Sequence, residues 1–432
     1  MRFPTFRHAN RREFLAAGLL GTVGLALSPL MQTLLAREDK KRAKACILVW
    51  LNGGPSHLDT FDPKPHADAQ VAGPFKAIET SVAGMRFSEH LPQLADQAKH
   101  LAIIRSLTSK EADHDRAYFY LHTGNLRDET VEYPALGSVV AHEWKDSEGD
   151  LPSFVALNGG APGGGFLGLD FDPYVVGNLD APLDNLNLPD GVDEDRLDRR
   201  LRALDALNKR YAEKSDLAKV VEHKKVTDKA LKLRKSPALK AFDLKEEKAE
   251  TLRAYGIPES APEGQPAPTF GKACLLARRM IENGVRFAEV TLDGWDTHAD
   301  NFNAVQALCK ELDPALATLT ADLADRGLLD QTLVLCMGEF GRTPAINPQN
   351  GRDHWSEAFS MLLAGGGVKG GQVVGASDDK GEHVKDKPVT IPDLYASVLT
   401  AFGINPGFTY HTPSGRPIKL AGKGNVVKEL FL

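Results

Sequence analysis

Cysteine is scarce in this sequence, which has four cysteines among 432 residues. No two of them have the C-x-x-C spacing, so the sequence predicts neither a disulfide framework nor a zinc site made of thiolates. Cys46 and Cys336 lie in apolar runs, which indicates that both side chains are buried.

An excess of one charge is also absent. The chain has 52 Lys and Arg residues against 58 Asp and Glu residues, and the net charge of -6 is spread along it without an acidic or basic tail. Nothing in this distribution indicates nucleic acid binding. Internal repeats and low-complexity tracts are absent too, and the length suffices for one large α/β domain with insertions or for two ordinary domains.

Residues 1–36 are predicted to be a twin-arginine secretion signal. Arg11 and Arg12 precede an apolar stretch from Ala16 to Ala36 that glycines and a proline interrupt. A membrane-spanning helix is the alternative, because the run is about 20 residues long. Leu34-Leu35-Ala36 is a poor cleavage site, so an uncleaved signal that anchors the chain in a membrane stays open. We expect a periplasmic or extracellular protein that leaves the cytoplasm, already folded, through the twin-arginine export machinery.

The remainder of the chain has the pattern of an α/β protein. Short apolar runs rich in β-branched residues alternate with longer helical patterns, which predicts a mainly parallel sheet covered by helices on both faces. The expected strands are 45–52, 101–107, 153–157, 285–292, 332–337 and 360–363, and the expected helices are 135–144, 272–283, 302–326 and 391–402.

The segment 194–255 differs from its surroundings. It is dense in charge, it lacks glycine, and its leucines recur at three- and four-residue spacing, which predicts an inserted helical hairpin or cap. A loop at 177–191 and a proline-rich linker at 256–268 bound it. Its lysines form either a solvated helix surface or an anion-binding face.

Several loops that follow the predicted strands carry both carboxylates and imidazoles. In α/β sheets, functional groups gather beyond the carboxyl ends of the strands, and this pair of groups suits a divalent metal. The alternative is a set of hydrogen-bonded structural pairs. The candidate metal ligands in these loops are His57, Asp59, Asp296, His298, Asp353 and His354.

A further histidine, His114, lies between Asp113 and Asp115 after the second predicted strand. Flanking carboxylates would raise the pKa of His114 and orient its ring, which suits a metal ligand or a general acid or base. An Asp-rich helix start that happens to contain a histidine explains the segment equally well.

Four motifs, together with the leader, carry a resemblance to a known family. They are 51–65 (LNGGPSHLDTFDPKP), 294–298 (GWDTH), 338–344 (GEFGRTP) and 351–355 (GRDHW). In these motifs the chain resembles the exported domain-of-unknown-function family numbered 1501, over nearly all of residues 45–432. That family is similar to sulfatases and alkaline phosphatases. The resemblance implies an alkaline-phosphatase-like, three-layer α/β/α sandwich with a metal site at the strand ends, and the charged helical segment as an insertion.

The resemblance also extends to single positions. Leu121-His122-Thr123-Gly124 is similar to the end of the sulfatase nucleophile motif, which places Asp113 where sulfatases carry a modified cysteine or serine. The 338–341 segment resembles the metal-holding Asp-His-Gly, which makes Glu339 a further implied ligand. Two departures matter, because Asn52 replaces the first metal-binding aspartate and no Ser, Thr or Cys occupies the nucleophile position. The resemblance therefore does not imply covalent sulfatase chemistry.

The resulting expectation is an exported hydrolase of sulfate or phosphate esters that depends on a divalent metal, either zinc, calcium or manganese. Arg342 would hold the anion through its planar guanidinium, and His114 would transfer a proton. The substrate would be a small anionic ester or a sulfated glycan. The alternative is a non-catalytic exported protein of the sulfatase fold that binds a glycan or a secreted partner through the same cleft and the 194–255 insertion.

Overall fold

The computed structural model describes residues 43–431 apart from 146–148, 184–185, 215–216 and 261–267. The predicted signal segment 1–36 lies outside the described residues. Among the described helices, none combines the length and the apolar character needed to cross a membrane.

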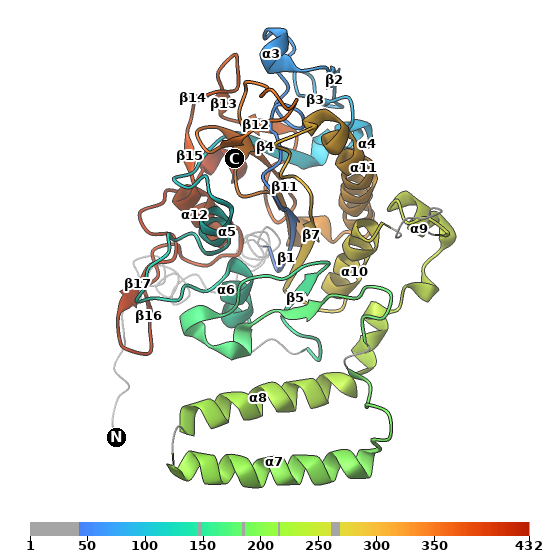
Figure 1. Cartoon of the computed structure of the whole chain (residues 1–432), viewed down its shortest axis with the longest axis vertical. Helices are drawn as coiled ribbons and strands as arrows, with labels where there is room; N and C mark the ends of the chain where they lie inside the picture. The colour runs from blue at the N-terminus through green and yellow to red at the C-terminus, as the bar shows by residue number, and fades with distance from the viewer. Residues whose placement is uncertain (1–42, 146–148, 184–185, 215–216, 261–267, 432) are drawn as a thin grey trace, which may run out of the picture.

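A nine-stranded sheet forms the centre of the molecule (Figure 1). Its order is β12-β4-β11-β8-β1-β7-β5-β6, with β15 paired to β4. Among these strands only β11 pairs antiparallel to its neighbours, so the sheet is mostly parallel, as predicted. The strands are β1 (Ala45–Leu51), β4 (Leu101–Thr108), β5 (Phe154–Leu157), β6 (Tyr174–Val176), β7 (Phe287–Leu292), β8 (Thr332–Met337), β11 (Phe359–Ala364), β12 (Gln372–Val374) and β15 (Val389–Thr390).

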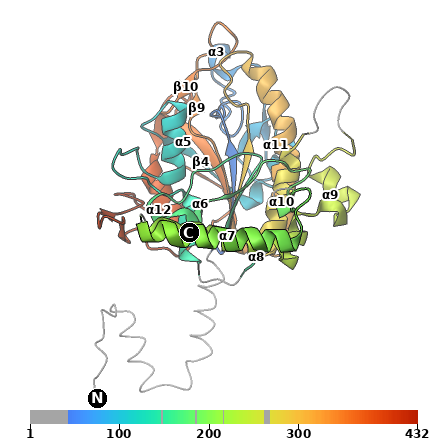
Figure 2. The same cartoon turned by 60° about the horizontal axis from the view of Figure 1, so that its bottom comes forward.

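Helices cover both faces of the sheet, which gives the three expected layers (Figure 2). Alternate side chains of the fully buried strand β1 enter two separate cores: Ile47 and Val49 lie in one, and Leu48 and Trp50 lie in the other. This alternation follows from the two-residue period of a strand. The first core includes α4 (Pro92–Asp96), α10 (Phe270–Glu282) and α11 (Asn301–Asp325), and the second includes α5 (His114–Thr123), α6 (Leu136–Glu143) and α12 (Ile391–Ala401).

The charged segment contains two long helices that pack side by side, α7 (Glu194–Lys214) and α8 (Leu217–Arg234), followed by the short α9 (Ala249–Ala254). Two lysines of α8, Lys225 and Lys229, reach Asp170 of the body at 3.2 and 3.1 Å. Exposed ion pairs of this kind contribute about 0–1 kcal/mol each, so these two add little to the attachment of the hairpin.

All four cysteines are free and buried, as expected of Cys46 and Cys336.

Smaller elements complete the described chain. The remaining helix and strands are α3 (Ala69–Ala72), β2 (Ala77–Glu79), β3 (Arg86–Ser88), β9 (Gly341–Arg342), β10 (His354–Trp355), β13 (Ala376–Ser377), β14 (Val384–Asp386), β16 (Tyr410–His411) and β17 (Pro417–Ile418).

The order of the strands brings the loops after β8, β1 and β7 together, because these strands are neighbours at the centre of the sheet. Gly53, just after β1, has a φ of 117°. A Cβ atom at Gly53 would overlap the main-chain nitrogen of Asp296, so the β1 and β7 loops touch backbone to backbone. Only glycine allows both this conformation and this approach.

We expect Gly53→Ala to lower the free energy of unfolding by more than about 2 kcal/mol, because it adds a clash to an unfavourable φ. Gly84→Ala is the matched control: Gly84 also has positive φ, at 78°, but a Cβ there meets no atom within 4 Å. Urea unfolding of both variants measures the difference. Equal losses would show that the two loops do not depend on the close approach.

Candidate metal centre

Three histidines and one aspartate converge at the carboxyl edge of the sheet. His114 is the first residue of α5, Asp296 and His298 lie in the loop after β7, and His354 begins β10. The Oδ1 atom of Asp296 lies 3.4, 3.2 and 3.4 Å from the Nε2 atoms of His114, His298 and His354. Ligand atoms of His114, Asp296 and His354 all lie within 4.8 Å of one another, so they could share one ion.

The second nitrogen of each ring faces a hydrogen-bond acceptor. The Nδ1 atoms of His114 and His298 lie 2.7 Å from Oε1 of Glu339 and 2.7 Å from Oδ1 of Asp353. The Nδ1 atom of His354 lies 2.8 Å from the carbonyl oxygen of Ala112. A carbonyl or carboxylate oxygen requires N–H at Nδ1, so in the neutral ring each Nε2 carries a lone pair. This is the arrangement that orients histidine ligands in metal sites.

The distances from the histidine nitrogens to Asp296 fit a bound cation. The Nε2 atoms of His298 and His354 are 2.9 Å apart, and two lone pairs at this distance repel unless a proton or a cation lies between them. Around a tetrahedral ion with bonds of about 2.0–2.1 Å, neighbouring ligand atoms are separated by roughly 3.3 Å. The contacts of 3.2 to 3.4 Å to Asp296 match this separation.

Arg342 lies behind Asp296 and not in the cleft. Its side chain is fully buried, and Nη2 lies 2.6 Å from Oδ1 of Asp296. Burial by itself would raise the pKa of Asp296, but the hydrogen bond and charge of Arg342 outweigh it and lower that pKa. The other donors of Arg342 bind the carbonyl oxygens of Gly53, Gly54 and Arg352. These contacts correct the expectation that Arg342 holds a substrate anion, because the group is occupied within the protein.

Glu339 and Asp353, which the sequence offered as ligands, contact the histidines instead. Oε1 of Glu339 also accepts the main-chain N–H of Gly53 at 2.9 Å, whereas Oε2 is buried without a partner. The hydrogen bond that His114 donates to Glu339 raises the pKa of His114, and the hydrogen bond that Asp353 accepts from His298 lowers the pKa of Asp353. In this structure both carboxylates hold histidine rings in place.

Two further predicted ligands, His57 and Asp59, are not brought to the cluster. Nε2 of His57 binds the carbonyl oxygen of Gly381 at 2.8 Å, and burial lowers the pKa of this histidine. Asp59 forms a fully buried ion pair with Arg352 at 2.8 Å and accepts hydrogen bonds from Ser56 and Asn301. Because Arg352 directly precedes Asp353 and His354, Asp59 supports the loop that carries them.

The position of the sulfatase nucleophile is occupied by a helix cap. Asp113 precedes α5, and its carboxylate accepts the main-chain N–H of Arg116 at 3.2 Å. The sequence had already placed no Ser, Thr or Cys at this position. Asp113 therefore acts as the N-cap of α5, where it accepts a hydrogen bond from an N–H that has no partner within the helix.

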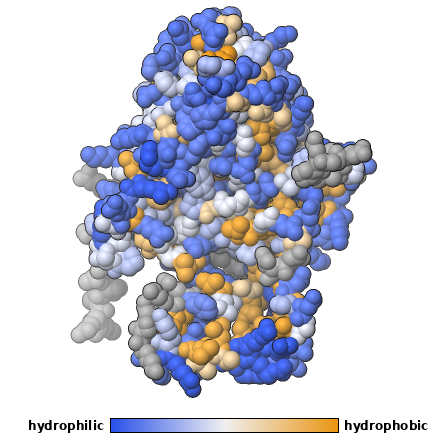
Figure 3. Space-filling model, viewed as in Figure 1, coloured by the Kyte–Doolittle hydropathy of each residue, from blue (hydrophilic) through white to orange (hydrophobic). Residues whose placement is uncertain are grey.

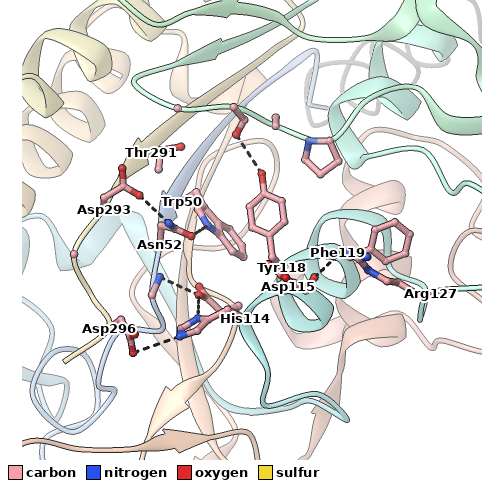
Figure 4. Close-up of a pocket in the computed structure, with 17 residues that line it drawn as sticks. Trp50, Asn52, His114, Asp115, Tyr118, Phe119, Arg127, Thr291, Asp293 and Asp296 are labelled. Carbon is pink, nitrogen blue, oxygen red and sulfur yellow. Dashed lines mark hydrogen bonds and ion pairs between the residues drawn. The ribbon is translucent and has the colours of Figure 1, made fainter. Parts of the chain in front are cut away.

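A cleft of about 880 Å³ adjoins the cluster (Figure 4). At its floor, Asn52 donates to Asp293 at 2.7 Å and accepts from the indole N–H of Trp50 at 3.2 Å. The other walls of the cleft were not predicted from the sequence, although the glycine-rich run at 159–165 after β5 is a usable signal of close approach. These walls include Tyr118, Phe119, Arg127, Gly159, Gly160 and Pro162.

The fold and the cluster define an α/β protein with a candidate metal centre at the strand ends. The chain belongs to a family described as protein of unknown function (DUF1501), whose profile matches residues 43–431. Among curated proteins no relative matches.

Several solved structures are similar in architecture. The sulfatase PsFucS1 of Pseudoalteromonas sp. is 14% identical, with 87% of this chain and 70% of that chain covered and a TM-score of 0.38. The phosphonate monoester hydrolase SpPMH of Silicibacter pomeroyi is 12% identical, with 90% and 76% covered and a TM-score of 0.39. A variant of TAB5 alkaline phosphatase with bound Mg is 11% identical, with 84% and 99% covered and a TM-score of 0.35. At these scores the likeness says nothing about the site.

We expect Asp59→Asn to lower the free energy of unfolding by about 3 kcal/mol or more, because it leaves the buried guanidinium of Arg352 without its charge partner. The metal content of the folded fraction should stay at the wild-type value, because Asp59 lies outside the cluster. Chemical unfolding and elemental analysis of the same preparation check both points. A folded variant that has lost its metal would show that metal binding depends on the Asp59–Arg352 pair, which supports the loop of His354.

Proposed function

We propose that this chain is an exported, metal-dependent hydrolase of phosphate or sulfate esters. The observation that carries the proposal is the convergence of three Nε2 atoms on one carboxylate oxygen, each ring being held at Nδ1 by an acceptor. His114, Asp296, His298 and His354 would hold the ion. The substrate would be a small anionic ester or a sulfated glycan, met in the periplasm or outside the cell after twin-arginine export. A membrane location would follow only if the signal stays attached.

The ligand types favour zinc among the three metals considered. Three imidazole nitrogens and one carboxylate oxygen suit zinc, and manganese accepts them less readily. Calcium prefers six to eight oxygen ligands, which this cluster does not provide. When bound, such an ion polarises an ester oxygen and lowers the pKa of a coordinated water.

The residues of the chain would prepare the site for this chemistry. Glu339 and Asp353 fix the rings of His114 and His298 and increase the basicity of the Nε2 atoms. Arg342 keeps Asp296 ionised. Nδ1 of His114 is held by Glu339, and Nε2 lies 3.4 Å from Oδ1 of Asp296, so we assign this residue to metal binding and not to proton transfer. The capping role of Asp113 favours direct attack by water over a covalent enzyme intermediate.

We expect the mature protein from the exported fraction to contain about one zinc ion per chain, and Asp296→Ala and His354→Ala to lose it together with hydrolysis of 4-nitrophenyl phosphate and 4-nitrophenyl sulfate. His223→Ala, at an exposed histidine of α8 far from the cluster, is the matched control and should retain both. Elemental analysis and initial rates give the two readouts. Wild-type turnover in both site variants, or metal-free wild-type protein that is well folded, would sink the proposal.

Glu339→Gln and Asp353→Asn should weaken zinc binding by roughly 10–100-fold without abolishing it, because they remove the charge behind a histidine and not a ligand. Competition with a chromophoric chelator measures the affinity. The same affinity as the wild type in both variants would mean that these carboxylates do not support metal ligands.

A second candidate function is supported by the charge of the α7–α8 hairpin. Residues 194–234 contain thirteen Lys and Arg against eight Asp and Glu, whereas the whole chain has a net charge of -6. Half of the exposed large apolar side chains among the described residues also belong to it, and apolar residues are visible on its face in Figure 3. These side chains are Leu207, Tyr211, Leu217, Val221 and Val226. A basic, partly apolar surface suits a non-catalytic role in binding an anionic glycan or a secreted partner.

Dextran sulfate distinguishes the two candidates. If the protein is a binding protein, it should retain dextran sulfate after removal of the metal, and the double variant Lys209→Glu/Arg210→Glu on α7 should weaken retention. If it is a hydrolase alone, any retention should be lost when the metal is removed and should not change in the double variant. Affinity electrophoresis through gels that contain the polymer measures both.

A further inference from the structure

The cleft has a second polar end, opposite the metal cluster. Figure 4 shows His114 and Asp296 at one end, Phe119 and Arg127 at the other, and Tyr118 between them. His114, Tyr118 and Phe119 all belong to α5, so one rigid helix forms this wall. A ligand that reaches from the cluster to Arg127 would lie along the helix.

Arg127 is the only lysine or arginine among the described residues that line the cleft. No carboxylate of the described chain lies within ion-pair distance of it, and its one hydrogen bond is a long one of 3.4 Å to the carbonyl oxygen of Asp115. The guanidinium lies 5.2 Å from the centroid of the Phe119 ring, which supports it from one side. Its remaining donors are therefore available to a ligand, unlike those of Arg342.

Most acidic residues of the cleft lie away from Arg127. Asp296 is paired with Arg342, Glu339 with His114, and Asp293 accepts from Asn52, so these three are tied to the cluster and the floor. Asp115 also lines the cleft and contacts Arg127 only through its main chain. An anionic group would thus be repelled along most of the cleft and attracted at Arg127, where a planar guanidinium can bind a carboxylate, sulfate or phosphate with two hydrogen bonds.

The wall opposite α5 is made largely of backbone. The hydroxyl of Tyr118 donates to the carbonyl oxygen of Gly160 at 3.2 Å, which holds this loop against the helix. A Cβ atom at Gly160 would meet nothing within 4 Å, although Gly160 lines the cleft. The absence of a side chain there leaves space in the cleft itself, and a substitution would fill this space without disturbing the packing of the protein.

We propose that Arg127 forms a second anion-binding subsite, and that the substrate carries an anionic group separated from the reacting ester by a body that fits beside Gly160. This inference rests on the proposed hydrolase function, since it deepens the same site. It identifies the substrate class as a doubly anionic ester and makes Arg127 a specificity-determining residue.

The probes are pairs of phosphonates, which resemble the ester and are not hydrolysed. Phenylphosphonate is compared with 4-carboxyphenylphosphonate, and 4-biphenylphosphonate with its 4′-carboxy derivative, so that two lengths are sampled. Titration calorimetry on zinc-loaded protein gives the affinities. We expect the wild type to prefer a carboxylated probe of one length by about 10-fold, which corresponds to a single good charged contact.

Arg127→Gln should abolish the preference, and Arg127→Lys should restore part of it. Arg116→Gln is the matched control, because Arg116 is an exposed arginine of the same helix that pairs with Glu111 and does not line the cleft. Gly160→Leu should weaken binding of the biphenyl probes by 10-fold or more while the zinc content stays unchanged.

The possible failures separate the two ideas. Phosphonate binding with no carboxylate preference, or a preference that survives Arg127→Gln, overturns the subsite and leaves the hydrolase proposal standing. Well-folded wild-type protein that contains no zinc overturns the hydrolase proposal. The same probes, titrated into this zinc-free protein, then test the Arg127 subsite through the preference for a carboxylated probe. If no probe binds, the subsite is overturned as well.

Discussion

The buried guanidinium of Arg342 joins the loops from which the candidate site is built. It binds the carbonyl oxygens of Gly53 and Gly54 after β1, that of Arg352 before β10, and the carboxylate of Asp296 after β7. A buried cation without partners would cost several kcal/mol, so the fold is stable only if these groups surround it. The same contacts that offset its desolvation also fix three loops relative to one another. Asp296, on which the histidines converge, is held in place by this arrangement.

A second buried arginine extends this framework. Arg352 binds Asp59 through its guanidinium and also donates to the carbonyl oxygens of Val71 and Thr343. The two arginines explain why conspicuous polar residues of the strand-end loops are not all exposed to the cleft. Asp59 and Arg342 have the chemistry of site residues, yet they serve the placement of Asp353, His354 and Asp296. The charged groups at this edge of the sheet therefore form two layers, and only the outer one faces the cleft.

The fold was largely predictable because its central strands are buried on both faces. The six apolar runs correspond to β1, β4, β5, β7, β8 and β11. The strands β6, β12 and β15 were missed because they are two or three residues long and partly exposed, as Val175 and Val373 show. The antiparallel direction of β11 was also beyond sequence reasoning, since a strand covered on both faces has the same composition in either direction.

The site was predictable in its residue types but not in its roles. Asp296, His298 and His354 were identified from the loops in which they lie. The sequence could not show that Glu339 contacts Nδ1 of His114, because the two residues are 225 positions apart and only the packing of α5 against the sheet brings them together. A carboxylate that binds a metal and one that orients a histidine are the same residue type, and a distance decides between them.

The charge of the cleft places a physical demand on any anionic ligand. Asp115, Asp293, Asp296 and Glu339 line it, and Arg127 is the one lysine or arginine described there. Arg342 offsets one of these negative charges from behind. An ester anion that approached the histidines would still face uncompensated carboxylates, and like charges at close range cost free energy even in a solvated cleft. A divalent cation between the three Nε2 atoms and Asp296 would reverse the sign of the field at that end. Metal binding and anion binding at this site are therefore expected to be coupled, and the ion would act in substrate binding before it acts in any chemical step.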